Sequence, residues 1–114
     1  MTRRRIAMSP VAENAAALLG TQIRLARHAK RWTAADLAER AGVSRVTVLN
    51  AEAGSPSVSL GNVLNMASLV GVELFGLDDP VELARARRRG EERLALIPSK
   101  VYKERGSGDG DFDF

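Results

Sequence analysis

TAADLAERAGVSRVTVLNAEAG, residues Thr33–Gly54, decides the fold of this chain. It predicts two short helices, because apolar residues recur at helical spacing in both halves. Thr33 and Ser44 each offer a hydroxyl that caps the helix after it, and Gly42 ends the first helix where a left-handed backbone is needed. Two helices joined by a short turn containing glycine form a helix-turn-helix, whose second helix enters the DNA major groove. The alternative is a helical hairpin that packs on some other partner.

The spacing within this stretch resembles the Cro/CI-like (XRE) family of helix-turn-helix repressors. Seven residues carry the resemblance inside the motif: Ala38, Gly42, Val43, Thr47, Val48, Glu52 and Gly54. The similarity continues upstream to Leu19 and downstream to Leu77. The resemblance implies an all-α, lambda-repressor-like five-helix helix-turn-helix domain with a short C-terminal extension, and double-stranded DNA as its ligand.

The rest of the chain is expected to divide around this motif. We predict a flexible basic arm over 1–10, the DNA-binding domain over 11–77, a C-terminal helix and extended segment over 78–105, and a flexible acidic tail over 106–114. Outside the motif, periodicity and capping residues predict helices over 11–30, 60–70, 72–77 and 80–94, and Gly90 is expected to weaken the last or end it early. Leu18, Leu60 and Phe75 are among the apolar residues expected to pack inward.

Composition limits the classes of function. The 114 residues include no Cys and a single His, His28, and the net charge is +3. No disulfide or thiolate metal site is available, which fits a reducing cytoplasm. No apolar run approaches the length of a membrane span, and no nucleophile, base or metal-ligand cluster stands at a recognisable spacing. We therefore expect no enzyme, no cofactor and no metal, and we expect recognition to be the chemistry.

The second helix of the motif carries the expected DNA contacts. By position in the resembling family, the residues that face DNA are Ser44, Arg45, Val46, Leu49 and Asn50, with Thr47 beside them, and Thr33 before the first helix is expected to help anchor phosphate. Arg45 can hold guanine O6 and N7, and Asn50 can pair with adenine or contact phosphate. Val46 and Leu49 offer only apolar contact. The family often has Gln where this chain has Ala34, so phosphate anchoring is expected from other groups.

Arg27 and Glu52 stand where the resembling family makes an ion pair between its first helix and its recognition helix. Such a pair gains little net stability after desolvation, but it orients the recognition helix. The alternative is two unrelated surface charges.

Two C-terminal features suggest protein partners. The apolar residues Leu94, Leu96, Ile97, Val101 and Tyr102 surround Pro98 and are expected to form an extended dimer contact, or else to pack on their own domain. Phe112 and Phe114 lie in the acidic tail and form either a partner-binding motif or a solvated end. The basic arm and the arginines of 80–94 are each either DNA contacts or solvated charges.

Three roles fit these features. The first is an autorepressor that binds a palindromic operator as a homodimer, like plain phage or plasmid repressors. The second follows a resemblance in layout to HipB-like antitoxins, which repress their own operon and neutralise a HipA-like kinase. The third is a protein-interaction module that has lost DNA binding.

Overall fold

The computed structural model describes residues 7–99, which form five helices and no strand. The helices are α1 (Pro10–Ala29), α2 (Ala34–Ala41), α3 (Arg45–Glu52), α4 (Leu60–Val70) and α5 (Pro80–Ala95). The chain divides into two compact units, Met1–Asp78 with α1–α4 and Asp79–Phe114 with α5. The predicted all-α fold of five helices with a helix-turn-helix is confirmed, although the fifth helix is not the one expected over 72–77.

Each helix begins where a short polar side chain caps its first turn. The N-cap residues are Ser9, Thr33, Ser44, Ser59 and Asp79, and each side chain accepts a hydrogen bond from a backbone N–H of the first turn. Gly42 and Gly71 end α2 and α4 with φ of 69° and 86°, a conformation that glycine adopts without steric cost. Because these signals are local, the helix boundaries follow closely from the sequence.

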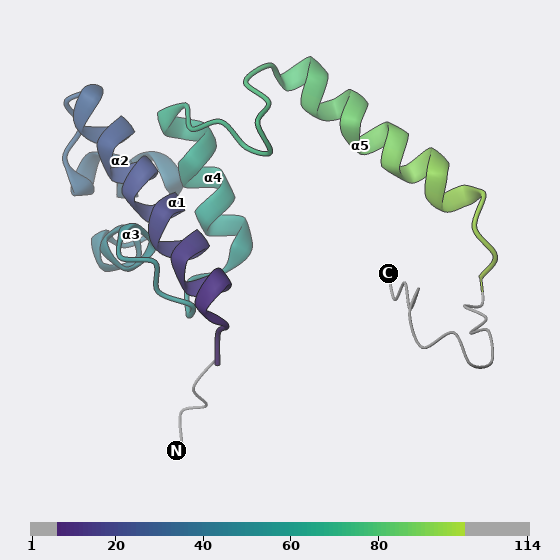
Figure 1. Ribbon diagram of the computed structural model, residues 1–114. Helices are drawn as coiled ribbons and strands as arrows, with labels where there is room; N and C mark the ends of the chain where they lie inside the picture. Colours follow the sequence, from purple (N-terminus) through teal and green to yellow (C-terminus); the bar gives the residue numbers. More distant parts are fainter. Residues whose placement is uncertain (1–6, 100–114) are drawn as a thin grey trace. The chain divides into compact units, whose positions relative to one another are not determined.

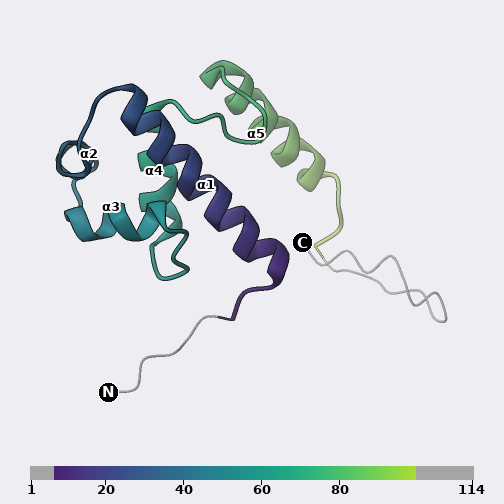
Figure 2. The same ribbon diagram turned by 60° about the vertical axis from the view of Figure 1, so that its left-hand side comes forward.

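The core of the first unit lies where α1 and α2 both pack on α3 and α4 (Figures 1 and 2). The buried apolar residues that form it are Ile23, Ala34, Leu37, Ala38, Val48, Ala51, Met66, Ala67 and Val70. Ile23, Leu37, Val48 and Met66 are the largest fully buried side chains. The core therefore takes residues from all four helices and holds α3 from its inner side.

Leu18 and Leu60, which were expected to pack inward, are exposed instead. Leu18 is 59% exposed, because it lies on the side of α1 away from the buried Ile23. Leu60 is 72% exposed, because it is the first residue of α4 and precedes the turns that reach the core. Met66, which the sequence did not single out, is completely buried. Helical spacing alone therefore did not identify which of the apolar residues in each helix are buried in the core.

The predicted helix over 72–77 is wrong. Leu74 and Leu77 instead form an isolated β-bridge, and the Leu77 N–H donates to the Leu74 carbonyl at 3.0 Å. Phe75 and Gly76 occupy the turn with φ of 58° and 71°, as in the tight turns that join antiparallel strands. Phe75 is 85% exposed and does not pack back. The few residues between Gly71 and Gly76 are too short for cooperative helix formation.

The second unit contains α5, which runs through Gly90 to Ala95. One glycine costs a helix only about 1 kcal/mol relative to alanine, and ion pairs between Glu82 and Arg85 and between Arg87 and Glu91 support the surrounding turns. The prediction of an extended segment from Leu94 is wrong at its start, since Leu94 is still helical. No residue of α5 is buried.

Several predictions lie outside residues 7–99. They concern the basic arm with Arg3, Arg4 and Arg5, the apolar residues Val101 and Tyr102, and the tail with Phe112 and Phe114. Within residues 7–99, no helix has the length and apolarity needed to cross a bilayer.

Candidate nucleic-acid interface

Helix α3 has one side in the core and one side in solvent. Val48 is completely buried and Ala51 is 4% exposed. Four side chains of α3 are exposed: Val46, Leu49 and Asn50 point away from the core, and Arg45 is the first residue of the helix. The exposed side thus combines one cation, one amide and two apolar groups. These are the groups that hydrogen-bond base edges or contact thymine methyls in a major groove.

The first turn of α3 is fixed by a pair of hydroxyls. The Ser44 hydroxyl accepts from the Thr47 N–H at 3.1 Å and lies 3.0 Å from the Thr47 hydroxyl. Ser44 is exposed, whereas Thr47 is half-buried. Ser44 therefore caps the helix as an acceptor, and its O–H can still donate to a ligand when Thr47 is the donor of the hydroxyl pair.

The first turn of α2 is fixed by a reciprocal capping box. The Thr33 hydroxyl accepts from the Asp36 N–H at 3.0 Å, and the Thr33 N–H donates to the Asp36 carboxylate at 2.8 Å. The hydrogen bond from the Thr33 backbone N–H, and next the Thr33 side chain, lower the pKa of the Asp36 carboxyl. Sequence reasoning found the Thr33 cap but not Asp36, although its spacing is that of a capping box. Ala34 is buried, so it offers no phosphate contact.

Arg27 and Glu52 form a buried, bidentate ion pair between α1 and α3. Arg27 Nε donates to Glu52 Oε2 at 2.6 Å, and Nη2 donates to Oε1 at 2.9 Å. The third nitrogen, Nη1, donates to the Trp32 carbonyl at 3.0 Å. The side chains are 7% and 4% exposed, and no buried side-chain N or O atom among the described residues lacks a partner. The bonds to Glu52 raise the pKa of Arg27, so its charge is permanent.

Trp32 closes the corner between α1 and α2. Its ring is half-buried against the core, and the Arg40 guanidinium carbon lies 4.2 Å from the ring centroid. The Lys30 ammonium lies 5.3 Å from the same centroid. A ring held between cations and core is a structural anchor with a cation–π contribution.

Together these contacts define a class of protein. A capped helix-turn-helix presents one exposed side of its second helix, and the other side is fixed by core packing and a buried ion pair. This is a DNA-binding domain of the kind that transcription regulators use. Residues 18–86, well over half of the chain, match the family model described as "Helix-turn-helix domain", and the chain belongs to that family. No curated protein and no solved structure gives a match.

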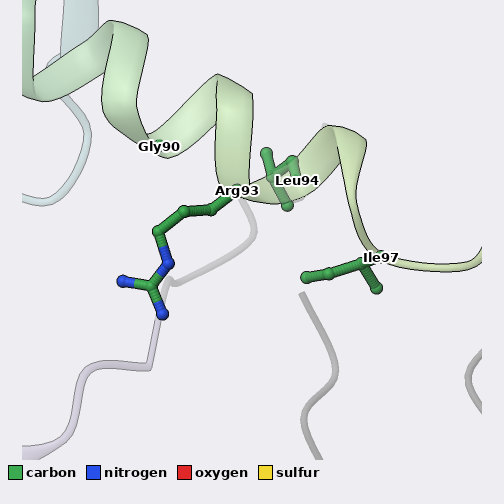
Figure 3. A pocket seen from close by; sticks show the side chains of 4 residues that line it. All are labelled: Gly90, Arg93, Leu94 and Ile97. Carbon is green, nitrogen blue, oxygen red and sulfur yellow. The ribbon is translucent and has the colours of Figure 1, made fainter.

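The second unit has its own exposed apolar cluster at the end of α5. Leu94, Leu96 and Ile97 are 57%, 86% and 52% exposed. Leu94 and Ile97 line an open hollow together with Gly90 and Arg93 (Figure 3). In the described part of the chain, no group of three or more His, Cys, Asp or Glu residues is arranged to hold a metal ion.

Proposed function

We propose that this protein is a sequence-specific autorepressor that binds a palindromic operator as a homodimer. The observation that supports this function best is the exposed side of α3. Arg45, Val46, Leu49 and Asn50 are all exposed on a helix that buries Val48, Ala51 and Glu52. Val46 is 62% exposed and Leu49 41% exposed there, beside a cation and an amide, and such a mixture fits a surface that reads base edges and thymine methyls.

Each exposed residue has a proposed role. Arg45 binds guanine O6 and N7 with two hydrogen bonds, and Asn50 pairs with adenine or contacts phosphate. Val46 and Leu49 contact thymine methyl groups. Thr33, Ser44 and Thr47 lie at the starts of α2 and α3 and contact the phosphate backbone, which positions the domain but carries no sequence information.

The homodimer is proposed because Arg45 is the one charged side chain proposed to contact bases in each half-site, and a single such contact gives modest specificity. Two copies related by a two-fold axis place two recognition helices one DNA turn apart and read a palindrome. We assign the dimer contact to Leu94, Leu96 and Ile97, together with Val101 and Tyr102 further along the chain. The exposure of the first three side chains supports this assignment, since clustered exposed apolar groups are typical of interfaces.

Selection of bound sequences from random duplexes tests the DNA-binding function. We expect enrichment of an inverted repeat with half-sites spaced about 10 base pairs apart. Enrichment of a single half-site would contradict the dimer, and no enrichment would favour an interaction module that has lost DNA binding. That last alternative is compatible with the buried Ala34 at the position where the resembling family often has Gln.

Truncation after Gly90 tests the dimer contact separately. The shortened protein should sediment as a monomer and should lose affinity for the selected duplex more than for a scrambled one. A truncated protein that remains dimeric would place the contact within α1–α4.

A role as an antitoxin is the second candidate. It is supported by the layout of the chain, in which a short unit with exposed apolar residues follows the DNA-binding unit. The proposed partner is a HipA-like kinase, and the proposed contact is the tail with Phe112 and Phe114. Deletion of 106–114 should leave DNA binding unchanged and reduce co-purification of the product of the adjacent gene. Equal recovery of that product would favour the plain repressor.

A further inference from the structure

Gly20 lies in the middle of α1, where α1 crosses the C-terminal end of α3. It is buried, and a Cβ atom built on it would lie 2.6 Å from the Ala51 carbonyl oxygen and 2.8 Å from the Glu52 carbonyl carbon. The Glu52 carbonyl oxygen would be closer still. These are backbone atoms and cannot rotate away as a flexible side chain would. No residue larger than glycine fits here unless α3 moves.

A second close approach lies just after α3. Gly54 follows the end of the helix with φ of 76°, and a Cβ there would lie 2.9 Å from both Cα and N of Ala17. Backbone thus approaches backbone closely at two points, one from α1 toward α3 and one from the residues after α3 toward α1. The Glu52 side chain is also held by Arg27 at the same end of α3. Three contacts therefore fix this end of α3 against α1.

We propose that Gly20 is a positioning residue for DNA recognition, and that its contact with the Ala51 and Glu52 carbonyls sets the direction in which α3 presents its exposed side. The inference rests on the proposed function, in which that side reads base edges. Glycine is among the least favourable residues in a helix interior, so its presence in α1 runs against helix propensity. The close approach of α3 accounts for it.

The distances indicate how far α3 would move. Ordinary van der Waals contact begins near 3.4 Å, so alanine at position 20 requires a displacement of about 1 Å at the end of α3. Helix α3 has eight residues and is about 12 Å long, so this displacement at one end changes the direction of the whole helix. Hydrogen bonds to base edges weaken once donor–acceptor distances exceed about 3.2 Å. A shift of about 1 Å therefore reduces sequence-specific binding more than it reduces the contacts to phosphates.

The experiment compares two glycine-to-alanine changes inside helices. Gly61→Ala in α4 is the matched control, since a Cβ there meets nothing within 4 Å. It should leave DNA binding within about twofold of the original and maintain or raise the melting temperature. Gly20→Ala is then added in the Gly61→Ala background, where any stability gained at position 61 offsets part of the loss at position 20. Each protein is titrated with the duplex selected by the original protein and with a scrambled duplex, at one salt concentration.

We expect Gly20→Ala to lower affinity for the selected duplex by at least about tenfold, while affinity for the scrambled duplex changes by less than about twofold. Circular dichroism should still show a helical, cooperatively melting protein. An unchanged ratio of the two affinities would overturn the inference, whatever happens to the melting temperature. A double variant that does not fold would also overturn it, because the contact would then be a requirement of folding. If the original protein selects no sequence at all, the proposed function itself fails, which is a different result from either of these.

Discussion

Helices α3 and α5 are both well formed and capped, but they are stabilised in different ways. Helix α3 has eight residues and buries Val48, Ala51 and Glu52. Helix α5 has sixteen residues and buries none. Its exposed ion pairs contribute only about 0.2–0.5 kcal/mol each, and an isolated helix of this length is marginal in water. Capping and spacing thus define a helix in the sequence, whereas the burial of its side chains depends on packing against other elements.

The strongest test of this contrast is the buried ion pair. Glu52→Gln should destabilise the first unit by about 3–5 kcal/mol, because Arg27 keeps its charge in a buried site without an anionic partner. Adding Arg27→Met should recover part of the loss. Thermal melts of both single variants and the double variant measure the coupling. Additive effects would mean that the two residues act independently.

The next largest effect is expected from removing a buried side chain of the first unit, compared with removing an exposed side chain of α5. Leu37→Ala should cost about 2–5 kcal/mol, since Leu37 is fully buried. Leu94→Ala on α5 is the matched control and should change the stability of the first unit by less than about 0.5 kcal/mol. Denaturant unfolding at low protein concentration, where dimers dissociate, gives both values. Equal costs would show that α5 is covered as fully as the core is.

A smaller effect is expected on the exposed side of α3. Arg45→Ala should weaken binding to the selected duplex by about 1–3 kcal/mol and relax the preference at one base pair in each half-site. The melting temperature should remain nearly constant, because Arg45 is exposed. Titration against duplexes substituted at single positions measures the effect. Equal weakening on every duplex would mean that Arg45 contacts phosphate.

The smallest effect concerns the capping box of α2. The pKa of Asp36 is lowered in the folded protein, so its contribution to stability is present at neutral pH. That contribution is lost as the pH falls below the ordinary carboxyl value of 3.8 and through the lowered value. Asp36→Asn should therefore remove part of the acid-dependent loss of stability and leave a slightly less stable protein at neutral pH. Melts over an acid pH series compare the two proteins, and parallel pH profiles would contradict the role of Asp36.

Much of the first unit could be predicted because its signals are local. Thr33, Ser44 and Gly42 mark helix ends through hydrogen bonds and backbone angles that neighbouring residues determine. Burial depends on residues distant in sequence, and this is why Leu60 was expected in the core and Met66 was not. The turn at Phe75 was missed for a related reason, since its left-handed backbone is uncommon for a bulky residue. The contact of Gly20 with α3 has no local signal at all.

The two sides of α3 also bear on how its DNA preference can change. The residues proposed to read bases, Arg45, Val46, Leu49 and Asn50, are exposed, so substitutions there should alter the preferred sequence at little cost to folding. The residues that hold the helix, Val48, Ala51 and Glu52, make no part of that surface. Divergent copies of this domain can therefore acquire new operators while the scaffold is inherited unchanged, and the same four positions form a compact library for redirecting it by design.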